Sequence, residues 1–184
     1  WQLLIPLICL MYKKYFPEKR YKITLAFLQE HISTQETILD LGVENPLSEQ
    51  MRALGYPVKN TSGEDLDIDQ SALIKADASV VTAFEIFEHL LNPFQVLQQI
   101  KSKKIVISVP LRLWFATAYR SKTDPWDRHY HEFESWQLDW LLEKTGWEIK
   151  AAKRWTNPTK KIGIRPLLRW FTPRYYMVYA EKKT

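Results

Sequence analysis

Three ionisable residues directly follow an apolar, β-branched run at residues 79–84: Glu85, Glu88 and His89. This placement needs an explanation, because burying unpaired charge is unfavourable. If the segment is helical, the three side chains project from one face at positions i, i+3 and i+4. Two carboxylates and an imidazole would then form half of a site for Mg²⁺, Mn²⁺ or Fe²⁺. The competing interpretation is a hydrogen-bonded structural cluster.

A second group of ionisable residues lies in the long segment 111–133. Its members are His129, His131, Glu132, Asp124 and Asp127. A histidine in this segment could complete a metal site or act as a general base. Alternatively, the charges order a lid through salt bridges. Residue spacing alone does not separate these two interpretations.

The tripeptide Asp40-Leu41-Gly42 is the third place where residue types suit chemistry. A glycine there would let the backbone approach a ligand, and the Asp40 carboxylate would accept a hydrogen bond from it. The alternative is that Gly42 merely ends a strand. The chain has only five glycines, and no two are spaced for a G-x-G or a G-x-x-x-x-G-K loop. The phosphate-binding loops of nucleotide kinases and ordinary dinucleotide dehydrogenases are therefore excluded.

The elements that position these loops alternate between strand and helix. Strands are predicted at 37–42, 56–61, 79–84, 104–109, 147–152 and 175–180, and a further strand could lie in the acidic stretch 64–69. Helices are predicted at 21–32, 47–55, 93–100 and 135–144. This alternation favours a doubly wound α/β sheet, in which ligands bind at the carboxyl ends of the strands. The last two strands lack a long helical crossover, so we expect them to pair antiparallel.

Length and composition fit one globular domain, since the chain has 184 residues of which 46% are hydrophobic and 26% charged. Its single cysteine, Cys9, allows no internal disulfide, so we expect a reducing, cytoplasmic location. The apolar run 3–12 is about half as long as a membrane span requires. We expect a packed or interfacial helix there.

Positive charge is concentrated at the C-terminal end. Residues 150–184 contain ten Lys or Arg and one acid, whereas the rest of the chain has 16 basic and 20 acidic residues. Together with segment 1–12, this charge could favour peripheral contact with an anionic membrane surface, and nucleic acid suits the same charge. The alternative is that the basic side chains only solvate a helix and loop between the final strands.

Taken together, these segments resemble the class I S-adenosylmethionine (SAM)-dependent methyltransferases, in the methyltransferase type 11 branch related to ubiquinone biosynthesis. The resemblance is carried by TILDLG, FEIFEHLLNP, KIVISVP, HEFESWQLDWLLEKTGWEI and RPLLRWFTPRYYMVYAEKK, of which the second is the most specific. It implies a Rossmann-like, seven-stranded and mostly parallel sheet with an antiparallel last strand. That sheet would form a single domain at 36–184, after an N-terminal helical segment at 1–35.

Three departures from the family pattern concern the cofactor. The first loop continues from Gly42 with Val43 and Glu44, so the family's second glycine is missing and a negative charge is added. Where the family has an acid that holds the ribose hydroxyls, at the end of the second strand, this chain has Asn60. The middle region is also too short for the family's second helix and third strand at full length.

The resemblance implies a bacterial enzyme that transfers a methyl group from SAM to an acceptor of the small-molecule, lipid or saccharide type. The expected cofactor-binding residues are Asp40, Gly42, Asn60 and Phe84; the expected catalytic residues are His131, His89 and Glu88. We expect His131 or His89 to be the general base. The tryptophans of the segment 111–133, Trp114 and Trp126, are expected to cover the acceptor.

Two further interpretations stay open. E-x-x-E-H followed by a histidine is similar to a metal-assisted branch that methylates RNA 3′ ends. Carried over, its Mg²⁺ ligands would be Glu85, Glu88, His89 and either His129 or His131. The other interpretation is a degenerate methyltransferase-fold protein that has lost SAM binding and acts as a binding or partner module.

Overall fold

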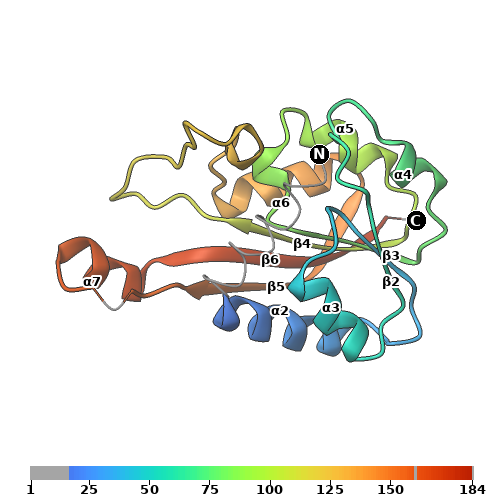
Figure 1. The fold of residues 1–184 in the computed structure, drawn as a ribbon, viewed down its shortest axis with the longest axis horizontal. Helices are drawn as coiled ribbons and strands as arrows, with labels where there is room; N and C mark the ends of the chain where they lie inside the picture. The colour runs from blue at the N-terminus through green and yellow to red at the C-terminus, as the bar shows by residue number, and fades with distance from the viewer. Residues whose placement is uncertain (1–16, 160, 184) are drawn as a thin grey trace.

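A computed structural model of the chain describes residues 17–159 and 161–183. The helix expected within 1–12 lies outside the described residues. Six strands form one sheet in the order β2-β1-β3-β4-β6-β5 (Figure 1). Their bounds are β1 (Ile38–Asp40), β2 (Val58–Asn60), β3 (Val80–Phe84), β4 (Lys104–Pro110), β5 (Trp147–Thr156) and β6 (Pro173–Lys182). All six core strand predictions are therefore confirmed.

The sheet is mixed. Strands β2, β1, β3 and β4 are parallel, while β6 is antiparallel to both β4 and β5. The doubly wound α/β class and the antiparallel pairing of the last two strands are confirmed. Because the carboxyl ends of the parallel strands meet at one edge, the loops after β1, β2, β3 and β4 lie together there.

The sheet has six strands where seven were expected, and the shortened middle region accounts for the difference. The strand that the acidic stretch 64–69 could have held is not formed; the short helix α4 (Ser71–Lys75) follows instead. Asp67 accepts hydrogen bonds from the backbone amides of Leu91 and Asn92, and Asp69 accepts one from the amide of Ser71. Aspartates that bind backbone amides in this way favour turns over strands.

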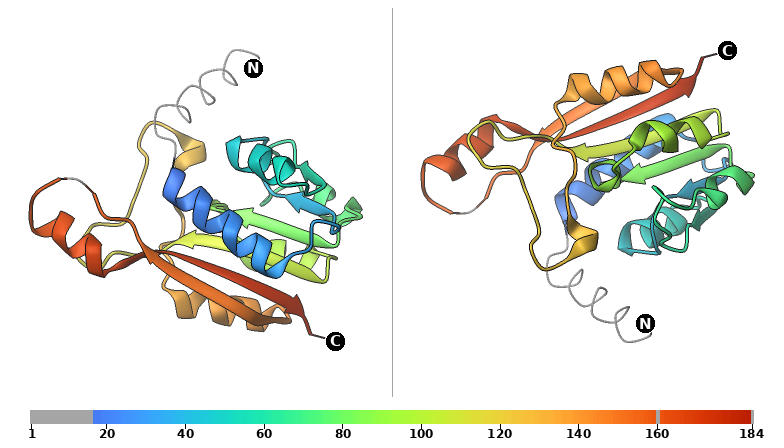
Figure 2. Two further views of the ribbon diagram at one scale, coloured as in Figure 1. Left: turned by 90° about the horizontal axis from the view of Figure 1, so that it is seen from below. Right: turned by 90° about the horizontal axis from the view of Figure 1, so that it is seen from above.

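Helices cover both faces of the sheet. Helices α2 (Glu18–His31) and α3 (Pro46–Ala53) lie on one face, and α5 (Pro93–Gln99) and α6 (Ser135–Lys144) on the other (Figures 1 and 2). The period-2 alternation of β4 explains why two layers form. Ile105 and Ile107 pack into the apolar cluster beneath α5 and α6, whereas Val106 between them packs into the cluster beneath α2 and α3.

The last two strands extend away from this core as a hairpin whose tip carries helix α7 (Ile164–Phe171). Both views of Figure 2 show α7 projecting past the other elements. Nowhere in the described residues is there a helix with the length and apolar character needed to cross a membrane.

Candidate functional site

Asp40 ends β1 and is buried among polar partners. Its carboxylate accepts a hydrogen bond from the Thr82 hydroxyl at 2.6 Å and one from the Asn60 amide at 3.0 Å. Strand register explains the grouping, because Asp40 is aligned with Asn60 on β2 and with Thr82 on β3. Burial outweighs these hydrogen bonds and raises the pKa of Asp40 from 3.8 to about 6.

Asn60, at the end of β2, has both of its side-chain polar atoms engaged. Its amide nitrogen donates to Asp40, and its oxygen accepts from the Arg52 guanidinium at 2.6 Å. Arg52 also forms an ion pair with Glu44, in the loop after β1. A chain of polar contacts therefore runs from Glu44 through Arg52 and Asn60 to Asp40, along the loop where the family resemblance expects a bare backbone.

Gly42 keeps the conformation that this loop requires. Its φ is +106°, which side chains other than glycine's rarely adopt, and its amide donates to the Thr61 hydroxyl at 2.8 Å. A Cβ at Gly42 would lie 3.4 Å from Cδ1 of Ile86. The loops after β1 and β3 therefore lie next to each other. Phe84, by contrast, packs against the apolar cluster beneath α2.

Glu85 begins the loop after β3, and it does not start a helix. Its backbone has a φ of +57°, and only Phe87–His89 forms a short 3₁₀ helix. Its carboxylate accepts from the Ser108 hydroxyl at 2.9 Å and pairs with Arg20 of α2 at 3.2 Å. The expected single helical face of Glu85, Glu88 and His89 is therefore not present, because contacts to β4 and α2 hold Glu85.

Glu88 is buried in the same loop. Its Oε2 atom has no hydrogen-bond partner among the described residues. Burial, reinforced by the nearby Glu85 carboxylate, raises the pKa of Glu88 well above its usual range. The backbone carbonyl of Glu88 accepts from the amides of Tyr130 and His131 at 2.8 and 3.2 Å. These two bonds dock the segment 111–133 onto the loop after β3.

Docking brings three potential ligand side chains together. One ligand atom each from Glu88, His89 and His129 lies within 4.8 Å of the others. The His89 and His129 rings meet edge to face, with centroids 4.8 Å apart. Burial and the neighbouring His89 lower the pKa of His129, which favours the neutral imidazole that metals bind. A carboxylate with two imidazoles suits Mn²⁺, Fe²⁺ or Zn²⁺.

The other expected residues of segment 111–133 take different positions. His131 lies outside this group, although its Nε2 atom is buried and has no hydrogen-bond partner among the described residues. Glu132 accepts from the Tyr119 amide at 2.8 Å and lies 3.7 Å from Nδ1 of His129. Trp114 and Trp126 are 71% and 69% exposed, so neither covers a site in the described structure.

A cavity of about 330 Å³ lies near His129. Two residues of its wall, Tyr119 and Glu132, also contact His129. Its remaining polar lining is mainly basic and comes from Arg120, Arg169 and Arg174. The cavity can therefore admit a small polar molecule or group next to Glu132 and near His129, one of the three potential metal ligands.

Sequence reasoning missed Thr82, Arg52 and the arginines of the cavity. Thr82 carried a usable signal, since it is the polar residue within an otherwise apolar strand. Arg52 carried none, because nothing local distinguishes it from a solvent-exposed arginine on a helix. Its partners Glu44 and Asn60 are each eight residues away along the chain, in different elements.

No model of a known protein family matches the sequence, and no curated protein matches it. Solved structures match the fold. The 1,6-didemethyltoxoflavin-N1-methyltransferase of Burkholderia thailandensis, solved with its substrate and S-adenosylhomocysteine, aligns with a TM-score of 0.62 and 13% identity, covering 100% of this chain and 90% of that one.

Two further structures agree. The magnesium protoporphyrin IX methyltransferase of Synechocystis PCC 6803, with bound SAM, gives a TM-score of 0.59 at 11% identity, covering 90% and 79% of the two chains. A chain in complex with the Haloferax volcanii methyltransferase activator Trm112 gives 0.58 at 12% identity, with 94% of each chain covered. At these identities the likeness establishes the fold, which is that of the class I SAM-dependent methyltransferases.

Proposed function

We propose that this chain is a SAM-dependent methyltransferase whose acceptor binds in the cavity near His129. The observation that carries the proposal is the proximity of two loops at one sheet edge. Ile86, in the loop with Glu88 and His89, would lie 3.4 Å from a Cβ added at Gly42, so this loop lies next to the loop with Asp40 and Gly42. A donor held by the first loop would thus face proton-accepting side chains of the second.

Several groups fit SAM. Gly42 has no side chain to exclude a ligand, and Asn60 stands at the end of β2, where the family pattern has the residue that holds the ribose hydroxyls. The buried Asp40 carboxylate would position Asn60 through their hydrogen bond. When bound, SAM supplies an electrophilic methyl group. The protein has to bind the donor, orient the acceptor and remove a proton. Arg52 would have to release the Asn60 oxygen before that oxygen could accept from a ribose hydroxyl.

His89 is the better supported general base. Its Nδ1 lies 2.9 Å from the Arg128 carbonyl oxygen, which can only accept, so Nδ1 carries the proton. Nε2 then keeps a free lone pair and lies 3.8 Å from Glu88 Oε1. Glu88 would position this ring and His131 would be the second candidate base, because its Nε2 is buried without a partner among the described residues.

The same group could instead hold a divalent metal. Glu88, His89 and His129 would be its ligands, and the metal would supply Lewis acidity next to the acceptor. Glu85 takes part less readily than the E-x-x-E-H pattern suggests, because Arg20 and Ser108 already hold its carboxylate.

Calorimetric titration with S-adenosylhomocysteine tests the methyltransferase proposal. We expect heat of binding at micromolar ligand, with folding of the same sample verified by circular dichroism. Folded protein that gives no heat at high micromolar ligand would contradict it.

One observation favours a second candidate function, that of a partner-binding module without cofactor. Both polar atoms of Asn60 are satisfied from within the protein, and the ion pair with Glu44 helps to hold Arg52 where it binds the Asn60 oxygen. For this candidate we expect no ligand density in a co-crystal with S-adenosylhomocysteine, and an unchanged contact between Arg52 and Asn60. Bound ligand in that crystal would remove this candidate.

A further inference from the structure

Helix α7 exposes its apolar side to solvent, unlike a helix that covers a core. Ordinarily the apolar side of a surface helix faces the protein and the polar side faces water. In α7 none of the residues is buried, and Ile164, Leu167 and Phe171 are 79%, 59% and 78% exposed. Arg169, on the other side, lines the cavity next to the segment 111–133.

The exposed apolar side chains form one surface. Ile164, Leu167 and Phe171 recur at positions i, i+3 and i+7, which places them along one helical face. Trp170 lies at the border of that face, and Ile162 precedes the helix; both are also largely exposed. A group of neighbouring, exposed apolar side chains is typical of a binding site for an apolar partner.

The charges around this surface specify the partner. Residues 161–174 contain four basic side chains and no acidic one: Lys161, Arg165, Arg169 and Arg174. Arg120 adds a further positive charge to the cavity wall. Within the described parts of the chain, the side chains of Arg120 and Arg169 take part in no hydrogen bond and no ion pair. Their charge is therefore available for an external anion.

An apolar face with tryptophan at its border and arginine opposite is the composition of helices that lie in a membrane interface. We propose that α7 docks this protein on an anionic lipid bilayer, its apolar face among the acyl chains. The adjoining cavity, with Arg120, Arg169 and Arg174, receives an anionic lipid headgroup. Because this is the cavity proposed for the methyl acceptor, the headgroup rests on that proposal as the acceptor, whereas binding of α7 to vesicles is measured without SAM and stands or falls apart from methyl transfer.

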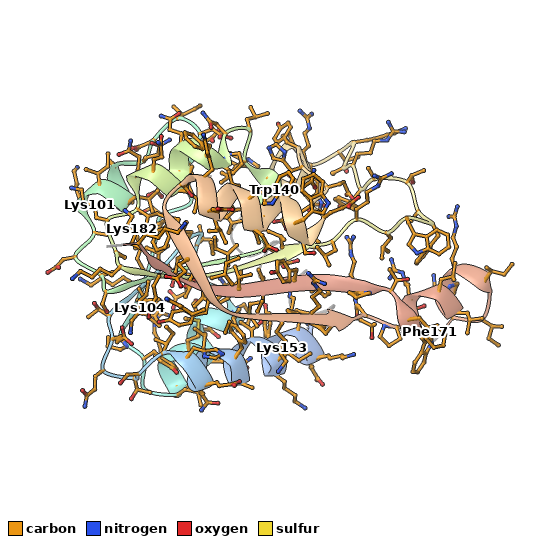
Figure 3. All side chains as sticks on the ribbon, turned by 180° about the vertical axis from the view of Figure 1, so that it is seen from behind. Lys101, Lys104, Trp140, Lys153, Phe171 and Lys182 are labelled. Carbon is orange, nitrogen blue, oxygen red and sulfur yellow. The ribbon has the colours of Figure 1, made fainter. Side chains whose placement is uncertain are left out.

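The docking surface is confined to the hairpin tip. Figure 3 shows Phe171 at one end of the molecule, while Lys101, Lys104 and Lys182 lie together at the other. Lysines remote from the tip therefore offer a control for charge alone. Ile68 and Leu91, which are 84% and 63% exposed outside α7, offer a control for exposed apolar side chains.

Flotation of the full chain with vesicles tests the proposal. The vesicles contain phosphatidylcholine alone, or phosphatidylcholine and phosphatidylglycerol in a three-to-one ratio. We expect binding to the mixed vesicles only. The double substitution Leu167→Ser and Phe171→Ser should weaken it by about tenfold or more, since two buried apolar side chains are lost. The matched pair Ile68→Ser and Leu91→Ser should bind like the wild type.

A second arm tests the cavity. Arg169→Gln should weaken binding to the mixed vesicles by about fivefold, the effect of one charge near an anionic surface, and Lys101→Gln by less. Unchanged binding of the Leu167→Ser, Phe171→Ser variant would overturn the proposal. So would wild-type protein that ignores vesicles but self-associates through α7 in sedimentation velocity, or that binds only an RNA oligonucleotide.

Discussion

The guanidinium of Arg52 donates to the side-chain oxygen of Asn60 across 2.6 Å, at the carboxyl end of β2. The amide nitrogen of Asn60 donates in turn to Asp40 across 3.0 Å. Asn60 is the residue from which a methyltransferase fold would reach the ribose of its cofactor. If the chain binds SAM as proposed, a ribose hydroxyl would compete with Arg52 for the same oxygen atom.

Removing this competitor should strengthen cofactor binding. We expect Arg52→Met to raise the affinity for S-adenosylhomocysteine by about tenfold, since a hydrogen bond to a charged group no longer has to be broken. Isothermal titration calorimetry measures the change. Lys59→Gln, which removes a neighbouring positive charge from β2, is the control and should leave the affinity unaltered. Equal or weaker binding by Arg52→Met would show that Arg52 does not block the site.

Adding a methyl group at Gly42 should affect both stability and binding. Gly42→Ala places a Cβ at a φ of +106° and 3.4 Å from Ile86, so we expect a loss of about 1–2 kcal/mol in the free energy of unfolding. Affinity for S-adenosylhomocysteine should also fall. Gly55→Ala is the matched control, because its φ is +93° but no atom lies within 4 Å of the added Cβ. It should lose similar stability and keep the affinity.

The raised pKa of Asp40 predicts a pH-dependent stability. Its pKa is about 6 in the folded protein against the ordinary 3.8 of an exposed aspartate, so between these values the folded state binds more protons than the unfolded state. Stability due to this group is therefore present below pH 4 and is lost as the pH rises through 6. The loss is about 3 kcal/mol at most.

Asp40→Asn abolishes this titration. Urea unfolding is measured at intervals from pH 4 to pH 7. Over that range the free energy of unfolding of the variant, relative to that of the wild type, should rise by about 2–3 kcal/mol. Comparing the slopes removes any constant effect of the substitution. A difference between the two proteins that does not vary with pH would mean that Asp40 titrates normally.

Metal binding at the histidine group predicts thermal stabilisation. We expect Mn²⁺ at about a hundredfold excess over its Kd to raise the Tm of the wild type by about 5 °C. Glu88→Gln and His129→Asn should remove the shift, because each deletes one of three donors that lie within 4.8 Å of one another. Differential scanning calorimetry with and without the metal measures it.

Two controls belong to this experiment. Glu85→Gln should keep the metal-induced shift, because Arg20 and Ser108 hold that carboxylate, although the basal Tm should fall. His31→Asn, on α2, should change the shift little. If the Tm of the wild type does not respond to Mn²⁺ or Zn²⁺, the group of Glu88, His89 and His129 is a structural cluster and not a metal site.

Much of the sheet was predictable from sequence because its strands are short apolar runs that end in turn residues. The run 104–109 became β4 with one added residue at its end, and its alternation sorted side chains between the two clusters. The acidic stretch 64–69 misled because the Asp67 carboxylate accepts hydrogen bonds from the backbone amides of Leu91 and Asn92, which are 24 and 25 residues away along the chain. No local pattern predicts a contact at that separation.

The candidate site was predictable in outline only. Spacing pointed to Glu85, Glu88 and His89 as one group. In the structure, Arg20 of α2 and Ser108 of β4 bind the Glu85 carboxylate, which is therefore engaged outside that group. The choice between His129 and His131 as the third ligand depends on how the loop 111–133 docks. Two backbone hydrogen bonds to the Glu88 carbonyl fix this docking, and no pattern of side chains in the sequence predicts them.

The sequence by itself determined the α/β class, the strand positions and the amphipathic character of IRPLLRWF, because these depend on residue periodicity and local hydrogen bonding. Only the tertiary structure decided that Arg52 binds Asn60, that His129 joins Glu88 and His89, and that the apolar side of α7 faces outward. Each of these depends on which distant segment lies next to a residue. Burial and charge pairing act through space, whereas periodicity acts along the chain.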